Sequence, residues 1–254
     1  MTINFHIQKD VLGLFPELRV FSVMVRGATR SPALIELGTR RLEEAVAHLS
    51  QLLPTTEALM GTPLITQWRD AYKSMGVKPS AYRCSFEALG RRAIAGKPLD
   101  TGVPAVNLYN AASIRHMACL GAYDAMRLSG APLELRFCRP DEDRFSPLGG
   151  SADDMPLRSG LVVYAQDREV LCWGLNHRDS EKTCLRADTT DMLFMAEGVT
   201  PVHAENAQKA LAAIRADLQQ LGFDTSVVQE MPRWPRASAS SEVLASGVVR
   251  ESVK

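Results

Sequence analysis

Apolar residues in the first half of the chain mostly recur every three or four positions, which is the spacing of an amphipathic helix. The exception is the segment LRVFSVMV at 18–25, which is rich in β-branched and apolar residues and predicts a buried strand. Prolines and serines near the starts of the periodic segments, and Gly76 and Gly96 near the ends of two of them, set the helix limits. The predicted helices are 31–53, 62–76, 80–96 with Ser80 as its N-cap, 104–117, and a short one over 121–128.

The second half of the chain changes to short apolar runs separated by polar turns. Strands are predicted at 133–138, 161–165, 170–173 and 192–196. The polar tetrapeptide 166–169 predicts a hairpin, and a last helical pattern covers 202–221. Helices followed by a run of strands and a closing helix indicate an α+β fold. We expect a single domain over 1–231 and a flexible C-terminal tail over 232–254, where Pro, Ser and Ala replace the apolar periodicity.

The charge balance restricts the kinds of partner. The chain has 254 residues, and its 29 basic and 29 acidic residues give a formal net charge of zero. Nonspecific nucleic-acid binding draws much of its affinity from phosphate neutralisation, so no global positive field supports it here. Any contact with a nucleic acid is therefore expected to be weak and local. The candidate surface for it comprises Arg83, Arg91, Arg92 and Lys97.

Several other functional classes lack their sequence signals. The five cysteines include no CxxC pair, which argues against a disulfide framework and a zinc ribbon. No P-loop, GxGxxG, HExxH or GxSxG pattern is present, and the five histidines have no ligand spacing, so we expect neither a cofactor nor a metal. The N-terminal residues do not resemble a signal peptide and no apolar run is long enough to span a membrane, so a cytoplasmic protein without membrane contact is expected.

Two of the predicted helices carry polar residues beside an apolar stripe. Arg83, Glu87 and Arg91 are four residues apart and share one face. They form either a surface ion-pair ladder or a carboxylate held at the edge of a pocket, with the arginines presented to an anion. On the helix 104–117, Asn110 and Ser113 share the face of the apolar residues. They either cap a neighbouring backbone segment or line a polar pocket.

The densest polar cluster, WGLNHRDS at 173–180, directly follows a predicted strand. Loops held by a rigid sheet often carry binding groups, but Asn and Asp also close turns through their own backbone, so both interpretations stay open. The candidate site residues in and near this loop are Trp173, Asn176, His177, Arg178, Asp179 and Thr189.

Taken in order along the chain, these segments resemble free-standing proteins of the B3/B4 domain family, over roughly residues 20–222. The B3/B4 domain is the tRNA-binding and editing module of the phenylalanyl-tRNA synthetase beta subunit. The matching motifs are Trp68-Arg-x-Ala-Tyr72, Gly76-Val-Lys-Pro-Ser80, Tyr82-Arg-x-Ser-x-Glu-Ala-Leu-x-Arg-Arg92, Val106-Asn-Leu-Tyr-Asn110 with Ser113, Gly121-Ala-Tyr-Asp124, Arg136, Phe145-Ser-Pro-Leu-Gly149, Gly160-Leu-Val-Val-Tyr164, Trp173 with Asn176-x-Arg-Asp-Ser180, and Thr189-Thr190.

The resemblance implies a three-layer B3/B4 fold, with helices packed on a mixed, β-sandwich-like sheet. It also implies a tRNA-associated hydrolase that removes the amino acid from mischarged aminoacyl-tRNA in trans, without aminoacylation activity of its own. Asn176, Arg178 and Asp179 are the expected catalytic residues, with Asn176 and Arg178 stabilising the oxyanion. Either Asp179 or Glu87 would orient the water or hold the substrate ammonium group. The expected substrate-binding residues are Arg83, Glu87, Asn110, Ser113, Trp173, His177 and Thr189.

One departure from the family pattern leaves rival functions open. The synthetase domain generally carries a histidine where this chain has Gly121. A glutamate of the synthetase pocket falls near the segment Met192–Glu197. The departure at Gly121 favours a non-catalytic module that binds an amino acid or tRNA. The neutral net charge favours a hydrolase of a small aminoacyl compound.

Overall fold

The computed structural model describes residues 4–232, which form seven α-helices, two 3-10 turns and ten strands. The helices are α1 (Lys9–Leu14), α2 (Pro32–Leu52), α3 (Thr56–Met60), α4 (Pro63–Ser74), α5 (Ser85–Ile94), α6 (Pro104–His116) and α7 (Pro201–Gln220), and the 3-10 turns are η1 (Ala125–Arg127) and η2 (Ala152–Asp154). The strands are β1 (Phe5–Ile7), β2 (Arg19–Arg26), β3 (Cys119–Asp124), β4 (Leu133–Phe137), β5 (Val162–Gln166), β6 (Glu169–Trp173), β7 (Arg178–Asp179), β8 (Met192–Gly198), β9 (Asp224–Thr225) and β10 (Gln229–Glu230).

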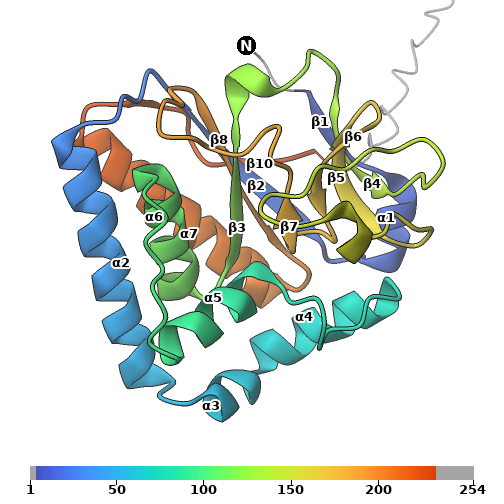
Figure 1. Ribbon diagram of the computed structural model, residues 1–254, viewed down its shortest axis with the longest axis horizontal. Coiled ribbons are helices and arrows are strands. Elements are labelled where there is room, and N and C mark those ends of the chain that lie inside the picture. Colours follow the sequence, from blue (N-terminus) through green and yellow to red (C-terminus); the bar gives the residue numbers. More distant parts are fainter. Residues whose placement is uncertain (1–3, 233–254) are drawn as a thin grey trace, which may run out of the picture.

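The strands form two sheets, shown at the centre and right of Figure 1. One sheet has the order β10-β2-β8-β3, with β9 also paired to β2, and all its strands are antiparallel. The other has the order β1-β4-β5-β6-β7, in which only β1 and β4 are parallel. This mixed two-sheet arrangement agrees with the α+β class predicted from the order of elements.

Helices cover the first sheet on the side away from the second. In Figure 1, α2, α6 and α7 lie together at the left of the molecule. α7 packs on β2 and β8, and α6 lies between α7 and α2. A second core lies between the two sheets, where α4 contributes Trp68 and Tyr72. The result is a layer of helices, a sheet, a shared core and a second sheet.

The side chains of strand β8 alternate between these two cores. Leu193 and Met195 point into the core between the sheets, whereas Phe194 and Ala196 point into the core under the helices. Because neighbouring side chains of a strand point to opposite faces, Glu197 falls on the side of Met195. The sheet pattern therefore directs a single carboxyl group into the space between the two sheets.

The end of β8 lies directly against the start of α7. A Cβ atom on Gly198 would overlap the backbone at Ala204 and His203, so only glycine allows this approach. The side chain of Thr200 caps α7 by accepting a hydrogen bond from the backbone N–H of His203. The turn that follows Glu197 is thereby held close to the helix.

Most of the elements predicted from periodicity are confirmed. The helices predicted over 31–53, 62–76, 104–117 and 202–221 correspond to α2, α4, α6 and α7, and the predicted strands and hairpin are all present. Short elements that carry little periodicity were not predicted. They are β1, α1, α3, β7, β9 and β10.

Two local predictions are wrong. Residues 119–124 form β3 and only 125–127 form a 3-10 turn, because pairing with β8 overrides the weak helical preference of this segment. Helix α5 begins at Ser85 with Cys84 as its N-cap, so Ser80 and Arg83 precede the helix. The predicted tail at 232–254 lies outside the described residues except for Pro232, and the single domain over 1–231 stays a prediction.

Candidate functional site

A pocket of about 310 Å³ lies between the two sheets and is closed by α5 and α6. Its volume is at the small end of the range for ligand sites, about 300–1,000 Å³. Its walls are apolar in part, and polar groups converge on it from several strands. The lining residues are Ser85, Ala88, Leu89, Arg92, Tyr109, Asn110, Leu120, Gly121, Tyr123, Leu148, Tyr164, Cys172, Leu175, Asn176, His177, Arg178, Asp179, Met195 and Glu197.

A tight turn after β6 places Asn176 at the centre of this pocket. Leu175 is fully buried and has φ of 62°, the left-handed region that a non-glycine residue adopts only when its surroundings enforce it. Its backbone N–H donates to the carbonyl of Val162 on β5, and the N–H of Asn176 donates to the carbonyl of Gly174. The sheet thus holds the turn in a strained conformation, which is common at functional sites.

The side chain of Asn176 joins three elements. Its Oδ1 accepts hydrogen bonds from the hydroxyl of Tyr72 on α4 at 3.1 Å and from the backbone N–H of Ser85 at 3.3 Å. Its Nδ2 donates to Oε1 of Glu197 at 2.6 Å. Because the three partners come from α4, α5 and β8, Asn176 fixes the position of both helices relative to the Glu197 carboxyl group.

Glu197 is the most deeply buried carboxyl group of the pocket, with 3% of its surface exposed. Its second oxygen, Oε2, accepts a hydrogen bond from the hydroxyl of Tyr164 at 3.0 Å. Burial raises the pKa of Glu197 to about 7, although the bonds from Asn176 and Tyr164 favour the ionised form and oppose this shift. The charge of Asp179 raises it further. Glu197 is therefore poised to gain or lose a proton near neutral pH.

Asp179 is the second carboxyl group of the pocket. Burial raises its pKa to about 6, and the thiol of Cys172 and the charge of Arg178 oppose the shift. The neighbouring imidazole adds little charge, because burial lowers the pKa of His177. Two carboxyl groups with raised pKa values in one pocket are typical of acid–base or cation-binding sites.

A cluster of arginines adjoins the pocket on α4 and α5. Glu87 is fully buried, and its carboxylate receives hydrogen bonds from Arg69 at 2.8 and 3.0 Å and from Arg91 at 2.9 Å. The guanidinium group of Arg83 lies 3.6 Å from the same carboxylate. Three cations surround one anion, so the cluster keeps an excess of positive charge. Arg92, one residue further along α5, lines the pocket itself.

The pocket brings together half of the site residues predicted from the sequence. Asn110, Asn176, His177, Arg178 and Asp179 all line it. The ring of His177 is held by a 2.9 Å hydrogen bond between Nδ1 and the carbonyl oxygen of Arg83. The polar loop 173–180 is therefore the part of the predicted site that the structure joins to a cavity.

The other predicted residues lie outside the lining, and four of them have structural contacts. Ser113 donates to the carbonyl of Ala118, which caps the end of α6. Trp173 stacks on Tyr82 in the core. Thr189 donates to the carboxylate of Asp124 at the end of β3. Glu87 is held by arginines.

The side chain of Arg83 contacts Glu87 and the carbonyl of Ser80 rather than the pocket. Arg178 does not pair with Glu87, which is occupied by Arg69, Arg83 and Arg91. Arg178 instead donates to the carbonyl of Leu148 at 3.2 Å, and its Nε is buried without a partner among the described residues.

The main residues not selected from the sequence are Glu197, Tyr164 and Tyr72. Glu197 carried a signal, since it is the only charged residue of an otherwise apolar strand, Met192–Gly198. Tyr164 and Tyr72 look like ordinary core aromatics, and only the packing of the two sheets and α4 shows that their hydroxyl groups bind site residues.

Replacement of Tyr164 by phenylalanine is expected to destabilise the protein by about 1–2 kcal/mol, because it leaves a buried carboxyl oxygen without its donor. The loss of folding free energy should be larger at pH 8 than at pH 5, because the hydrogen bond from Tyr164 stabilises the ionised form of Glu197 more than the protonated form. Urea unfolding at both pH values measures this. Tyr82→Phe is the matched control, because its hydroxyl donates at the surface to the carbonyl of Asp154. Equal losses at the two pH values would contradict the assigned role.

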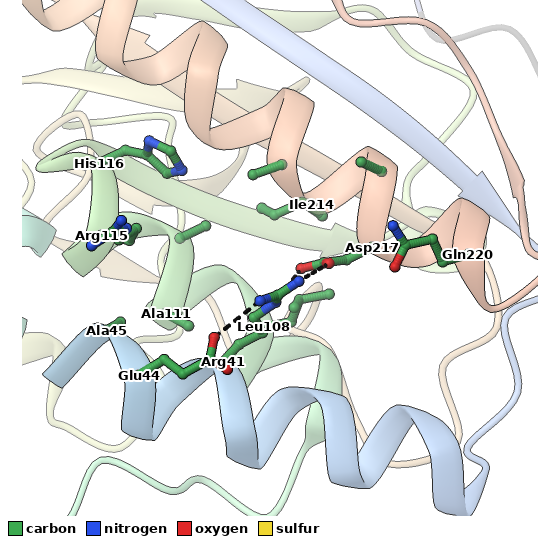
Figure 2. Close-up of a pocket in the computed structure, with 13 residues that line it drawn as sticks. Arg41, Glu44, Ala45, Leu108, Ala111, Arg115, His116, Ile214, Asp217 and Gln220 are labelled. Carbon is green, nitrogen blue, oxygen red and sulfur yellow. Dashed lines mark hydrogen bonds and ion pairs between the residues drawn. The ribbon is translucent and has the colours of Figure 1, made fainter. Parts of the chain in front are cut away.

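A larger hollow of about 500 Å³ lies between α2, α6 and α7, away from this polar network (Figure 2). Its apolar lining consists largely of alanines, together with Leu108 and Ile214. Arg41 spans it and pairs with Asp217 at 2.6 Å and with Glu44 at 3.0 Å. Its central charged groups are thus already paired with one another, and we take the smaller pocket as the candidate site.

Two further observations bear on the class of site. Among residues 4–232, no group of three or more His, Cys, Asp or Glu side chains is placed to hold a metal ion. None of the helices within the same range is long and apolar enough to cross a membrane.

Comparison with known proteins gives the family. No curated protein matches the chain. Among solved structures, an N-terminal fragment of the phenylalanyl-tRNA synthetase beta subunit from Pyrococcus horikoshii aligns with 91% of this chain at 13% identity and a TM-score of 0.45. The chain spans 55% of that fragment. The family model of the B3/4 domain matches residues 67–221, which include most of α4, all of α5 to α7 and every pocket residue. The chain therefore belongs to the B3/4 domain family.

Proposed function

We propose that the pocket binds the aminoacyl group of a mischarged aminoacyl-tRNA and hydrolyses its ester bond, as a trans-editing deacylase. The observation that carries this proposal is the convergence of Asn176, Arg178, Asp179 and Glu197 on one small cavity. Amide and guanidinium donors together with a carboxyl group of near-neutral pKa are the groups that ester hydrolysis needs.

In the proposed reaction, Glu197 orients a water molecule and accepts its proton as the water oxygen bonds to the ester carbonyl carbon. Its pKa of about 7 suits proton transfer near neutral pH. Arg178, with the free proton of the Asn176 amide, stabilises the oxyanion. The bond between the carbonyl carbon and the ribose oxygen then breaks. The proton passes to that oxygen, which releases the free amino acid and the tRNA.

The arginine cluster supports a substrate that carries phosphate. Arg69, Arg83 and Arg91 outnumber the single carboxylate between them, and α5 carries Arg91 of this cluster as well as one wall of the pocket. A nucleic acid bound there would meet a local positive field although the chain is neutral overall. The few cations make the contact weak and local.

A non-catalytic amino-acid or tRNA binding module is the second candidate. It is favoured by the 2.6 Å bond between Asn176 and Glu197, which occupies both groups with each other, and by glycine at position 121. A hydrolase of small aminoacyl compounds, favoured by the neutral net charge, is a third.

A deacylation assay against a panel of mischarged tRNAs tests the proposal. We expect the wild-type protein to hydrolyse at least one of them, and Arg178→Lys to do so at least about tenfold more slowly, because an ammonium group cannot replace the planar guanidinium fork. Arg168→Lys, at an exposed position, is the matched control and should retain full activity.

The rival functions give different results in the same assay. Saturable binding of an amino acid without turnover of any tRNA indicates a binding module. Hydrolysis of small aminoacyl esters with no activity on tRNA indicates the third function. If Arg178→Lys keeps full activity with an unchanged melting temperature, the role of Arg178 is wrong.

A further inference from the structure

The carboxylate of Asp179 has few direct partners among the described residues. Within residues 4–232, no Lys, Arg or His side chain forms an ion pair with it, and the only side-chain hydrogen bond to it comes from the thiol of Cys172. The adjacent guanidinium group of Arg178 is directed to the carbonyl of Leu148. The carboxylate is partly buried, and the charge of Arg178 acts on it without a direct ion pair. Because a partly buried charge is stabilised by a direct partner, this carboxylate can accept a cationic group of a ligand.

Gly121 leaves the same carboxylate open on one side. A Cβ atom at this position of β3 would lie 3.8 Å from both Oδ1 and Oδ2 of Asp179, so any longer side chain would lie over the carboxylate. Glycine leaves that space to the pocket, which both residues line. A ligand group placed beside Gly121 would therefore contact Asp179.

The carboxyl group of Glu197 is less available to a ligand than that of Asp179. Both oxygens of Glu197 already accept hydrogen bonds, from Asn176 and from Tyr164. Asp179 has no such pair of donors. Of the two acidic groups, Asp179 is the one free to bind a cationic group of a ligand.

We propose that Asp179 binds the α-ammonium group of the substrate, so that the site takes aminoacyl groups with a free amine and rejects N-acylated and α-hydroxy analogues. This inference rests on the proposed function for the position of the acyl group. It assigns Gly121 the role of leaving room for the ammonium group. It also separates the roles of the two carboxyl groups: Asp179 binds the amine, and Glu197 acts on the water.

Binding of an ammonium group should strengthen as the pH rises through about 6, because burial holds the pKa of Asp179 at about 6 and only its ionised form attracts the ligand. The other groups facing Asp179 from the elements around it are Cys172 on β6, Glu197 on β8, Tyr123 on β3, Tyr109 on α6 and Arg178 beside it. Burial raises the pKa values of the thiol and of both phenols, so these groups stay neutral in this range. Glu197 ionises near pH 7 and adds to the attraction above that value.

Calorimetric titration with three probes tests the inference without requiring catalysis. The probes are L-phenylalaninamide, L-3-phenyllactamide, in which a hydroxyl replaces the amine, and N-acetyl-L-phenylalaninamide. An aromatic side chain is chosen because Leu89, Leu120 and Met195 line the pocket. At pH 6.8, where the amine stays mostly protonated and Asp179 is mostly ionised, we expect the free amine to bind about tenfold or more tightly than either analogue, the usual effect of a hydrogen bond to a charged group.

Asp179→Asn should remove this discrimination by weakening phenylalaninamide about tenfold or more and leaving phenyllactamide unchanged. Asp188→Asn, at an exposed position in the same segment, is the control and should keep the discrimination. Equal affinity of the wild-type protein for the three probes, no binding of any of them, or discrimination retained in Asp179→Asn would each overturn the inference. Selective binding of phenylalaninamide without deacylation of any tRNA would support the inference and reject the proposed hydrolysis.

Discussion

Substitution of Asn176 by aspartate is expected to make the protein stable in mild acid and unstable in mild base. The change is nearly isosteric, but it replaces the amide donor 2.6 Å from Oε1 of Glu197 by a second carboxyl group. At low pH one shared proton can bridge the two groups. Above neutral pH both tend to ionise at hydrogen-bond distance in a buried site, and we expect a loss of about 3–5 kcal/mol relative to the wild type at pH 8.

The direction of the pH dependence follows from the raised pKa. Burial places the pKa of Glu197 at about 7 in the folded protein, above the ordinary value of 4.5 that it regains on unfolding. The unfolded chain therefore releases this proton first, and stability falls as the pH rises from about 4.5 to about 7. In the aspartate variant the fall should be steeper and should extend to higher pH, because the second carboxyl group is affected in the same way.

Urea unfolding between pH 4.5 and 8.5 measures this effect. Asn206→Asp on α7 is a suitable control, since its side chain is only partly buried and the substitution adds the same charge away from the pocket. If the stability curve of the Asn176→Asp variant runs parallel to the wild-type curve, Asn176 and Glu197 do not interact as described.

Replacement of Glu87 by alanine should cost about 3–5 kcal/mol of folding free energy, because it leaves the guanidinium groups of Arg69, Arg83 and Arg91 together without their common anion. The affinity of the pocket for its ligand should fall as well. Arg69 belongs to α4 and Arg91 to α5, so the Glu87 carboxylate ties together the two helices that carry Tyr72 and the α5 wall. Chemical denaturation and the affinity for phenylalaninamide measure the two effects.

Glu87→Gln separates charge from shape at the same position. It keeps the volume and one acceptor oxygen, and we expect roughly half of the loss seen in Glu87→Ala. Glu36→Ala, at an exposed position on α2, is the control and should change stability by less than about 0.5 kcal/mol. If Glu87→Ala also changes stability by less than about 0.5 kcal/mol, the arginine cluster is a weak surface ion-pair ladder. That is the alternative interpretation given in the sequence analysis.

Elements with long, regular periodicity were predictable from the sequence, and contacts between distant elements were not. The apolar spacing of α2 and α7 shows directly which residues are buried, because one helix face repeats every turn. Strand β3 was misread as a helix because its six residues acquire their conformation from pairing with β8, about seventy residues later in the chain. Local preference carries little information about such a partner.

The site shows the same division between local and distant information. The loop around Asn176 and Asp179 was identified because polar residues are concentrated after an apolar strand. Glu197 and Tyr164 were not selected, because they meet only where the two sheets pack together. Ser113 and Thr189 lie outside the pocket lining, because their hydroxyl groups bind a nearby carbonyl and a nearby carboxylate, which the sequence pattern does not show.

The pairing of β8 with β2 also has a consequence for biosynthesis. Strand β2 leaves the ribosome more than 160 residues before β8, and β8 lies between β2 and β3 in the sheet. Until β8 has been made, β2 and β3 lack their shared neighbour and Glu197 is absent from the pocket. Contacts of such long sequence separation form slowly. Ligand binding should therefore appear only after β8 has been made, and chains truncated before residue 198 should expose unpaired strand edges to chaperones and proteases.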